Sequence, residues 1–353
     1  MDAALAVLLT AVLTLIIGKL VLFRLRCPNA PPCISGWIPW FGVAFQFGKG
    51  PLEFIEQARV KYGPVFTVFA LGHRYTFVTE EEGIEAFFMS KDVNFEQAVQ
   101  QAVKHTVSIP AKVFYKNRYN LYVMLKGKMA PPNLHIFMKT LCKELHEFVE
   151  QLGTGGTEEL RDLVRNWSKS KQWLLKTLEK VTSAAARPNP SKSESKTVLQ
   201  HLLDTLPDKH FAPNYSLLLL WASQANAVPV AFWTLVFIIS HPDIYKKIME
   251  DIVSVFGNAG KDKIEISQDD LKKLPLIKWC VLEAIRLRSP GAITKKVMNP
   301  IKIQNFTIPA GDMLMISPYW LHRNPKYFPD PDMFKPDRWK AANLEKNAFL
   351  DNF

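Results

Sequence analysis

The chain has 353 residues, of which 48% are hydrophobic and 22% charged, and this balance excludes a largely disordered protein. Its formal net charge of +11 suits anionic lipid, an acidic protein partner or nucleic acid. Nucleic acid is not expected, because the Lys and Arg residues form no arginine-rich tract and no zinc-finger or ribonucleoprotein-type motif accompanies them. The four cysteines (Cys27, Cys33, Cys142 and Cys280) have no repeated spacing, so neither a disulfide framework nor a zinc site is predicted.

The chain begins with an apolar run, residues 3–23, that is long enough to span a bilayer core as a helix. Only Asp2 precedes the run, whereas Arg24 and Arg26 follow it, so the positive-inside tendency keeps the body of the protein cytoplasmic. A cleaved signal peptide is the alternative, but it needs positive charge before the run and a small-residue cleavage site after it. The sequence therefore predicts a membrane anchor and basic collar over residues 1–26.

Prolines dominate the next segment and predict a stiff, extended hinge over residues 27–50. The remainder, residues 51–353, is expected to form one domain that is mostly α-helical with a minor β region. Its amino-terminal half contains an amphipathic helix at 51–62 and a β-hairpin around Gly72. Further helices are predicted at residues 81–90, 133–151 and 161–178, and a polar, proline-broken loop at 183–196.

Residues 214–239 predict a long helix that is apolar on nearly every side, as expected inside a large domain or a membrane. A polar interruption at 223–226 and Pro229 favour the domain interior, since such residues kink a helix and bring polar groups beside a ligand. Ser267 then predicts a helix cap, and Pro275 begins another apolar helix that short strands follow.

Glu283 and Arg286 lie one helical turn apart on this last helix. On a surface such a pair contributes roughly a few tenths of a kcal/mol, which is the alternative to a special role. In an apolar helix, however, separate charges are costly, and Arg338 would complete a hydrogen-bonded network with them.

The order of four motifs resembles the cytochromes P-450: ExxR at 283–286, then IPAG, then HRNP, then FKPDRW at 334–339. The resemblance implies a mostly α-helical cytochrome P-450 fold that binds haem. It also implies that Glu283, Arg286 and Arg338 form a structural triad bracing the haem-side core.

By the same resemblance, the long apolar helix is similar to the oxygen-binding helix of that family, with Ala225 and Asn226 where most members carry an acid–threonine pair. The Asn226 amide is then the catalytic group that orients water, while Ala225 and Val228 line the substrate pocket. A core asparagine satisfied by backbone is the alternative. Lys296 falls where many relatives have an arginine for a haem propionate, and a solvated lysine is the equal alternative.

The run LLLLWASQANAVPVAFW resembles the branch of steroid 7α-hydroxylases and prostacyclin synthases, and NPKYFP and KAANLEK are closest to oxysterol 7α-hydroxylases. The resemblance implies oxysterol 7α-hydroxylation in cholesterol catabolism and bile acid synthesis. It implies a sterol substrate, dioxygen, an NADPH-dependent reductase and the lipid of the endoplasmic reticulum membrane.

The sequence departs from the family in two places. The family's iron ligand is a cysteine in a loop, FxxGxxxCxG, downstream of the PxRW motif, and this sequence stops at Phe353 before such a loop and the helix that follows it. The interval 151–214 is also short for the helices expected there. We therefore expect a truncated fold with no axial ligand and no activity. A non-catalytic, membrane-tethered remnant that binds sterol or reductase is the alternative.

Overall fold

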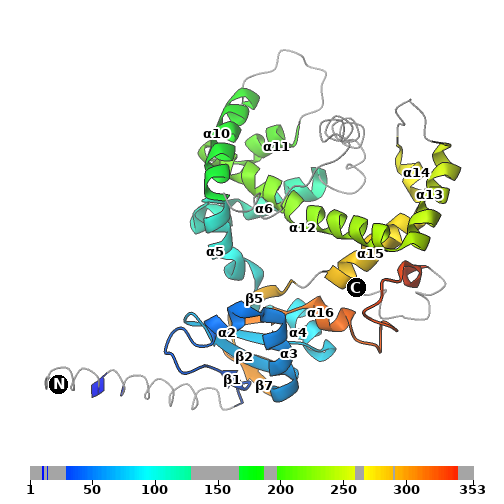
Figure 1. Cartoon of the computed structure of the whole chain (residues 1–353). Helices are drawn as coiled ribbons and strands as arrows, with labels where there is room; N and C mark the ends of the chain where they lie inside the picture. The colour runs from blue at the N-terminus through cyan, green and yellow to red at the C-terminus, as the bar shows by residue number, and fades with distance from the viewer. Residues whose placement is uncertain are drawn as a thin grey trace. The chain divides into compact units, whose positions relative to one another are not determined.

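The computed structural model describes residues 10–11, 14, 29–128, 167–186, 197–258, 266–288 and 291–340 (Figure 1). Two compact units make up the chain. The first contains Met1–Val99 and Ser289–Met333, and the second Gln100–Arg288 and Phe334–Phe353. The helix expected at 133–151 and nearly all of the apolar run at 3–23 lie outside the described residues.

The first unit is built on a six-stranded sheet whose strand order is β1-β2-β3-β8-β5-β4. Strands β1 and β2, and likewise β3 and β8, run parallel, and the remaining neighbours are antiparallel. The β2–β3 pair confirms the hairpin predicted around Gly72, since both Leu71 (φ 51°) and Gly72 (φ 77°) adopt the left-handed conformation of a tight hairpin turn. The strands of this unit are β1 (Cys33–Ile34), β2 (Val65–Ala70), β3 (His73–Val78), β4 (Val93–Asn94), β5 (Ile293–Val297), β8 (Met313–Ile316) and a separate pair, β6 (Ile301–Ile303) with β7 (Phe306–Ile308).

Helix α3 (Pro51–Tyr62) confirms the predicted amphipathic helix and has local signals at both ends. Pro51 occupies its first turn, where the missing N–H is not needed, and Gly63 ends it with φ 91°. Its buried Ile55 and Ala58 pack with Phe66 and Phe77 of the sheet. The other helices of this unit are α2 (Ala44–Lys49), the 3₁₀ helix η1 (Glu81–Gly83), α4 (Ile84–Met89) and α16 (Pro318–His322).

The described part of the expected hinge at 27–50 is integrated into the first unit. It supplies β1 and α2, and Val43 from it is buried beside α3. Backbone pairing with β2 therefore holds part of the segment for which the prolines predict a stiff, extended spacer.

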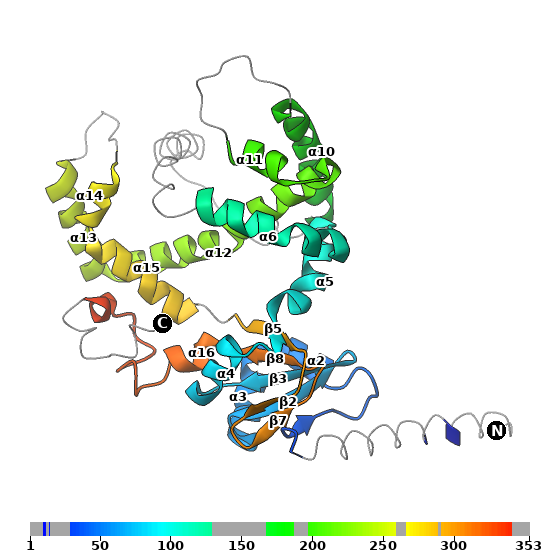
Figure 2. The same cartoon turned by 180° about the vertical axis from the view of Figure 1, so that it is seen from behind.

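The second unit is helical, so that the chain is mostly α with a minor β region, as predicted (Figures 1 and 2). Helix α5 (Phe95–Val107) begins in the first unit and ends in the second. The predicted caps at Ser267 and Pro275 are present at α14 and α15. The helices are α6 (Ala111–Lys128), α10 (Trp167–Ala185), α11 (Val198–Thr205), η3 (Lys209–Phe211), α12 (Ala212–Ser240), α13 (Pro242–Phe256), α14 (Gln268–Lys272), α15 (Pro275–Arg288) and η4 (Pro336–Trp339).

Helix α12 is the predicted long apolar helix, but only its two ends lie in the interior. Its first half packs with α6, α10 and α11, and its second half with α13 and α15, as Figure 2 shows. The middle, residues 220–229, is exposed, so the expectation that the polar interruption would be buried is wrong. The stretch Lys209–Ser240 is long and apolar enough to cross a membrane by length and composition alone, a test that core helices of soluble proteins also pass.

Candidate functional site

Glu283 and Arg286 form a fully buried ion pair on α15, with exposed fractions of 0% and 1%. Arg286 donates through Nε to Glu283 Oε2 at 2.9 Å and through Nη2 to Oε1 at 2.8 Å. This two-pronged geometry matches the planar guanidinium to the carboxylate, which is the strongest arrangement available to such a pair. The ion pair that the i,i+3 spacing predicts therefore lies in the interior and not on a surface.

A second set of donors reaches the same carboxylate from the segment around η4. Arg338 Nε donates to Oε1 at 2.9 Å, as the predicted triad requires. The backbone N–H of Lys335 donates to Oε1 at 3.0 Å and the indole N–H of Trp339 to Oε2 at 2.8 Å. Sequence reasoning missed Lys335 and Trp339. Trp339 could have been predicted, because it follows Arg338 in the motif. The Lys335 donor could not, because a backbone N–H gives no signal in the sequence.

The donors decide the protonation state of Glu283. Burial alone raises the pKa of its carboxyl group, but the hydrogen bonds from Arg286 and the Lys335 backbone, with the charges of Arg286 and Arg338, outweigh it. The pKa is therefore lowered and the carboxylate stays ionised. A carboxylate held so firmly has no free lone pair for proton transfer, so the arrangement is suited to bracing α15 against the η4 segment.

Aromatic contacts extend this network to α12. The Arg288 guanidinium lies 4.1 Å from the centre of the Trp233 ring, a cation–π distance. Phe237 stacks on Phe334 with ring centres 4.6 Å apart. The second half of α12 is thus fixed to the same two segments that Glu283 joins.

The remaining predicted residues of α12 lie on its exposed middle. Asn226 is exposed, and Val228 is 54% exposed. Pro229 lies inside the helix and has no N–H, so the carbonyl of Ala225, four residues earlier, receives no regular helical hydrogen bond. The helix therefore presents, on an accessible stretch, an amide side chain next to a backbone carbonyl that lacks its regular helical donor.

Lys296 lies in β5 of the first unit, where it pairs in register with Asn94 and Met313. Its neighbour Lys295 is the engaged lysine: it donates to the Phe87 carbonyl at 2.8 Å and lies 5.0 Å from the centre of that ring. Burial lowers the pKa of Lys295. Because successive strand residues face opposite sides, Lys296 does not share these contacts.

A further buried carboxylate, which sequence reasoning missed, lies directly before β8 in the first unit. Asp312 is 1% exposed and accepts from Arg74 Nε and from Thr76 Oγ1, each at 2.8 Å. Burial raises its pKa in spite of the Arg74 charge and these hydrogen bonds. The partners are more than 230 residues apart in the chain, so no local pattern could have found them.

Neither described cysteine fits the thiolate ligand that the resemblance implies. Cys280 is fully buried, and burial, with the nearby charges of Asp337 and Glu283, raises the pKa of its thiol to about 12. Burial also raises the pKa of Cys33, although the charge of Arg74 opposes this. Both thiols therefore stay protonated at neutral pH. Cys27 and Cys142 lie outside the described residues.

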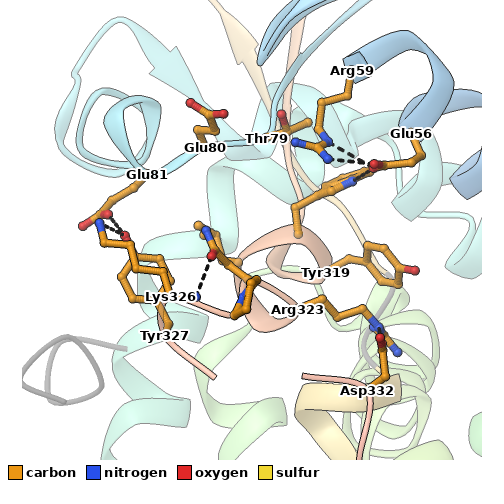
Figure 3. Close-up of a pocket in the computed structure, with 14 residues that line it drawn as sticks. Glu56, Arg59, Thr79, Glu80, Glu81, Tyr319, Arg323, Lys326, Tyr327 and Asp332 are labelled. Carbon is orange, nitrogen blue, oxygen red and sulfur yellow. Dashed lines mark hydrogen bonds and ion pairs between the residues drawn. The ribbon is translucent and has the colours of Figure 1, made fainter. Parts of the chain in front are cut away.

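A polar cavity of about 590 Å³ lies in the first unit between α3, η1, α16 and the loop that follows α16 (Figure 3). The charged groups that line it are largely paired with one another. Arg59 binds Glu56 at 2.7 Å, Arg323 binds Asp332 at 3.0 Å, and the Tyr327 hydroxyl donates to Glu81. None of the residues predicted for the site lines this cavity.

Comparison with known proteins gives relatives over almost the whole chain. The chain is 52% identical to the 24-hydroxycholesterol 7-alpha-hydroxylase of Homo sapiens over 402 aligned positions, covering 98% of this chain and 86% of the relative. It is 49% identical to the protein of the same name from Mus musculus, covering 96% and 83%. The human alignment has more positions than this chain has residues, so part of that relative has no counterpart here.

The cytochrome P450 family model matches residues 31–160 and 156–350, and its two matches meet inside the interval that looked short in the sequence. The solved structure of retinoic acid bound cyanobacterial CYP120A1 matches with a TM-score of 0.69 at 18% identity, covering 90% of this chain and 83% of that one, which shows the fold alone. Family and fold imply haem as the cofactor, although neither described cysteine fits as its ligand. The chain therefore belongs to the cytochrome P450 family and is, by family, an enzyme.

Proposed function

We propose that this protein is an oxysterol 7α-hydroxylase, a haem-dependent monooxygenase that hydroxylates position 7 of a side-chain-hydroxylated cholesterol in cholesterol catabolism and bile acid synthesis. The observation that carries the proposal is the 52% identity with a 24-hydroxycholesterol 7-alpha-hydroxylase over 98% of the chain. The aligned span covers 98% of the chain and so takes in the segments that carry the Glu283 network and the exposed stretch of α12.

The residues divide between holding the fold and facing the substrate. Glu283, Arg286 and Arg338 brace α15 and do no chemistry. On the exposed stretch of α12, Asn226 orients water through its amide, and Ala225 and Val228 contact the apolar sterol. The Ala225 carbonyl, which lacks its regular helical donor because of Pro229, supports this assignment, because an acceptor next to an amide donor can hold one water molecule in a fixed orientation.

Lys296 is the proposed cation for a haem propionate. Two observations support it: Lys296 is partly exposed in β5, and its neighbour Lys295 is already engaged by the Phe87 carbonyl.

The proposed setting is the endoplasmic reticulum membrane, with residues 1–26 as anchor, 27–50 as the connecting segment and 51–353 as the cytoplasmic catalytic domain. The apolar run and its flanking arginines support the anchor. An NADPH-dependent reductase is the proposed electron donor, and the net charge of +11 suits an acidic partner.

A second function is favoured by one observation, the two protonated thiols. If no other cysteine provides a thiolate, the chain is a membrane-tethered protein that binds sterol or reductase without turnover. The raised pKa values of Cys33 and Cys280 favour this function, because they keep both thiols protonated and a thiolate is the form that binds iron.

The test uses the purified full chain with 24-hydroxycholesterol, reductase and NADPH, together with the carbon monoxide difference spectrum of the reduced protein. A thiolate-type Soret band and a 7α-hydroxylated product support the hydroxylase, and both should persist in Cys33→Ser and Cys280→Ser. Saturable sterol binding without band or product supports the second function. Absence of product and of binding to either sterol or reductase contradicts both.

A further inference from the structure

Helix α13 of the second unit carries two rows of apolar side chains, and only one of them is covered (Figure 1). The covered row is centred on the buried Ile248 and packs in one apolar core with α12 and α15. The other row consists of Tyr245, Met249 and Val253, whose side chains are 48%, 41% and 41% exposed. Residues four apart are neighbours on a helix, so these three side chains form a continuous row. We call this row the α13 stripe.

Two opposite charges lie beside the α13 stripe. Lys246 and Glu250 are exposed and line the same open, apolar hollow as the stripe. Among the residues that the structure describes, neither has a partner of opposite charge. A lysine four residues before a glutamate is also the less favourable order for an ion pair within one helix. The α13 stripe therefore suits a partner that offers an apolar row, an anion for Lys246 and a cation for Glu250.

A second copy of α13 meets all three requirements, because the two partners of a two-fold contact use the same surface. In an antiparallel contact with the two-fold axis at Met249, Tyr245 of one copy would lie against Val253 of the other. Lys246 and Glu250 flank the stripe on the same side, so Lys246 of one copy would face Glu250 of the other. At 1.5 Å per residue these two positions are only about 3 Å apart along the helix axis. The contact would therefore contain this ion pair twice.

Another exposed apolar row in the second unit lacks this complementarity. Helix α6 exposes Tyr119 and Tyr122, at 71% and 61%, but it contains no Asp or Glu. A two-fold contact on α6 would bring like charges together, which opposes association. The charged residues of α6 are all cations: Lys112, Lys116, Arg118, Lys126 and Lys128.

We propose that this protein forms a two-fold dimer through the α13 stripe. The dimer does not depend on whether the chain hydroxylates a sterol. Rows of residues spaced by four are the ones that interdigitate in the commonest class of helix packing. The contact is small, since a stable interface has about 20–30 residues on each side. The dimer is therefore weak and reversible, with a dissociation constant of about 1–100 μM.

The test reverses the two charges in separate variants and then mixes the variants. Lys246→Glu brings two glutamates together across the contact, and Glu250→Lys brings two lysines together. Each variant alone should associate at least about tenfold more weakly than the unaltered chain, because both ion pairs become repulsive. In a one-to-one mixture, one copy carries two glutamates and the other two lysines, so both pairs form again and association should return. Both positions are exposed, so the packed core is unchanged.

Sedimentation equilibrium of the full chain in density-matched detergent measures the association, at concentrations up to about 100 μM. The matched control is Lys116→Glu, which makes the same change of charge at an exposed position of α6 and should associate like the unaltered chain. A second pair of variants tests the apolar row. Tyr245→Ser should weaken association, whereas Tyr119→Ser, which removes a more exposed tyrosine from α6, should not.

Three results would overturn the proposal. A chain that stays monomeric throughout the concentration range forms no such dimer. Association that both charge variants retain belongs to a different surface. A mixture that remains monomeric, although circular dichroism shows both variants to be folded, would exclude the Lys246–Glu250 pairs and with them the two-fold contact.

Discussion

Replacing Glu283 with glutamine is the most direct test of the buried network. The carboxylate accepts at least five hydrogen bonds, from Arg286 twice, Lys335, Arg338 and Trp339. Glutamine keeps the shape but puts an NH₂ group where donors already point, and it leaves a buried arginine without its counter-charge. Removing one partner of a buried pair costs about 3–5 kcal/mol. The local opening equilibrium should therefore rise by about a hundredfold to several thousandfold.

Amide hydrogen exchange of the full chain in detergent measures this change where it occurs. Peptides covering α15 and η4 should lose protection by that factor, and peptides from β2 and β3 of the first unit should not change. Asp269→Asn is the matched control, because its i,i+3 ion pair with Lys272 is largely exposed, with 80% and 68% of the side chains accessible. If Glu283→Gln lowers protection no more than the control does, the network does not hold these segments together.

The other predictions concern the pH response of two buried carboxylates, a buried amide and an interrupted helix. The pKa of Glu283 is lowered, so the stability that its carboxylate contributes is fully present above the ordinary pKa of 4.5 and is lost as the pH falls below that value. The pKa of Asp312 is raised, so this residue contributes stability as the pH falls towards its ordinary pKa of 3.8. Amide protection of α15 should therefore fall below pH 4.5 while that of β8 does not, and parallel loss from about pH 6 would contradict this. Asn117 is 3% exposed and its Oδ1 meets no donor in the described part of the chain, so Asn117→Leu should raise the free energy of unfolding by about 1–3 kcal/mol in a guanidinium titration; a decrease would refute the reasoning. Pro229→Ala restores the N–H that the Ala225 carbonyl lacks and should stabilise α12 by up to about 3 kcal/mol; unchanged amide exchange across residues 225–229 would contradict it.

The sequence predicts elements well where the signal is local. Helix α3 begins at a proline and ends at a glycine with positive φ, and the Ser267 capping box fixes the start of α14. The hairpin at Gly72 follows from two β-rich runs around one turn. In each of these cases a few neighbouring residues determine the backbone.

Burial was harder to predict than secondary structure. The composition of α12 predicts a helix but cannot say which elements cover it, and its middle is exposed because its neighbours pack on its two ends. The Arg74–Asp312 contact joins positions 238 residues apart, and no periodicity encodes such a distance. The triad at Glu283 could be found because its motif residues keep a fixed order, whereas the Lys335 N–H depends on the path of a loop.

The path of the chain explains why the ExxR and PxRW motifs must act together. The second unit is left at Arg288 and re-entered at Phe334, and the residues between them build β5 to β8 and α16 of the first unit. Bringing the two ends of this segment together costs conformational entropy, and contacts between sequence neighbours cannot offset that cost. The hydrogen bond from Arg338 to Glu283 closes the segment across 55 positions, and the Phe237–Phe334 stack secures the point of re-entry. The buried carboxylate therefore joins the two parts of the second unit on either side of the inserted segment. A variant that weakens the hydrogen bonds of Glu283 should free the η4 segment, while the strands β5 to β8 of the inserted segment stay paired.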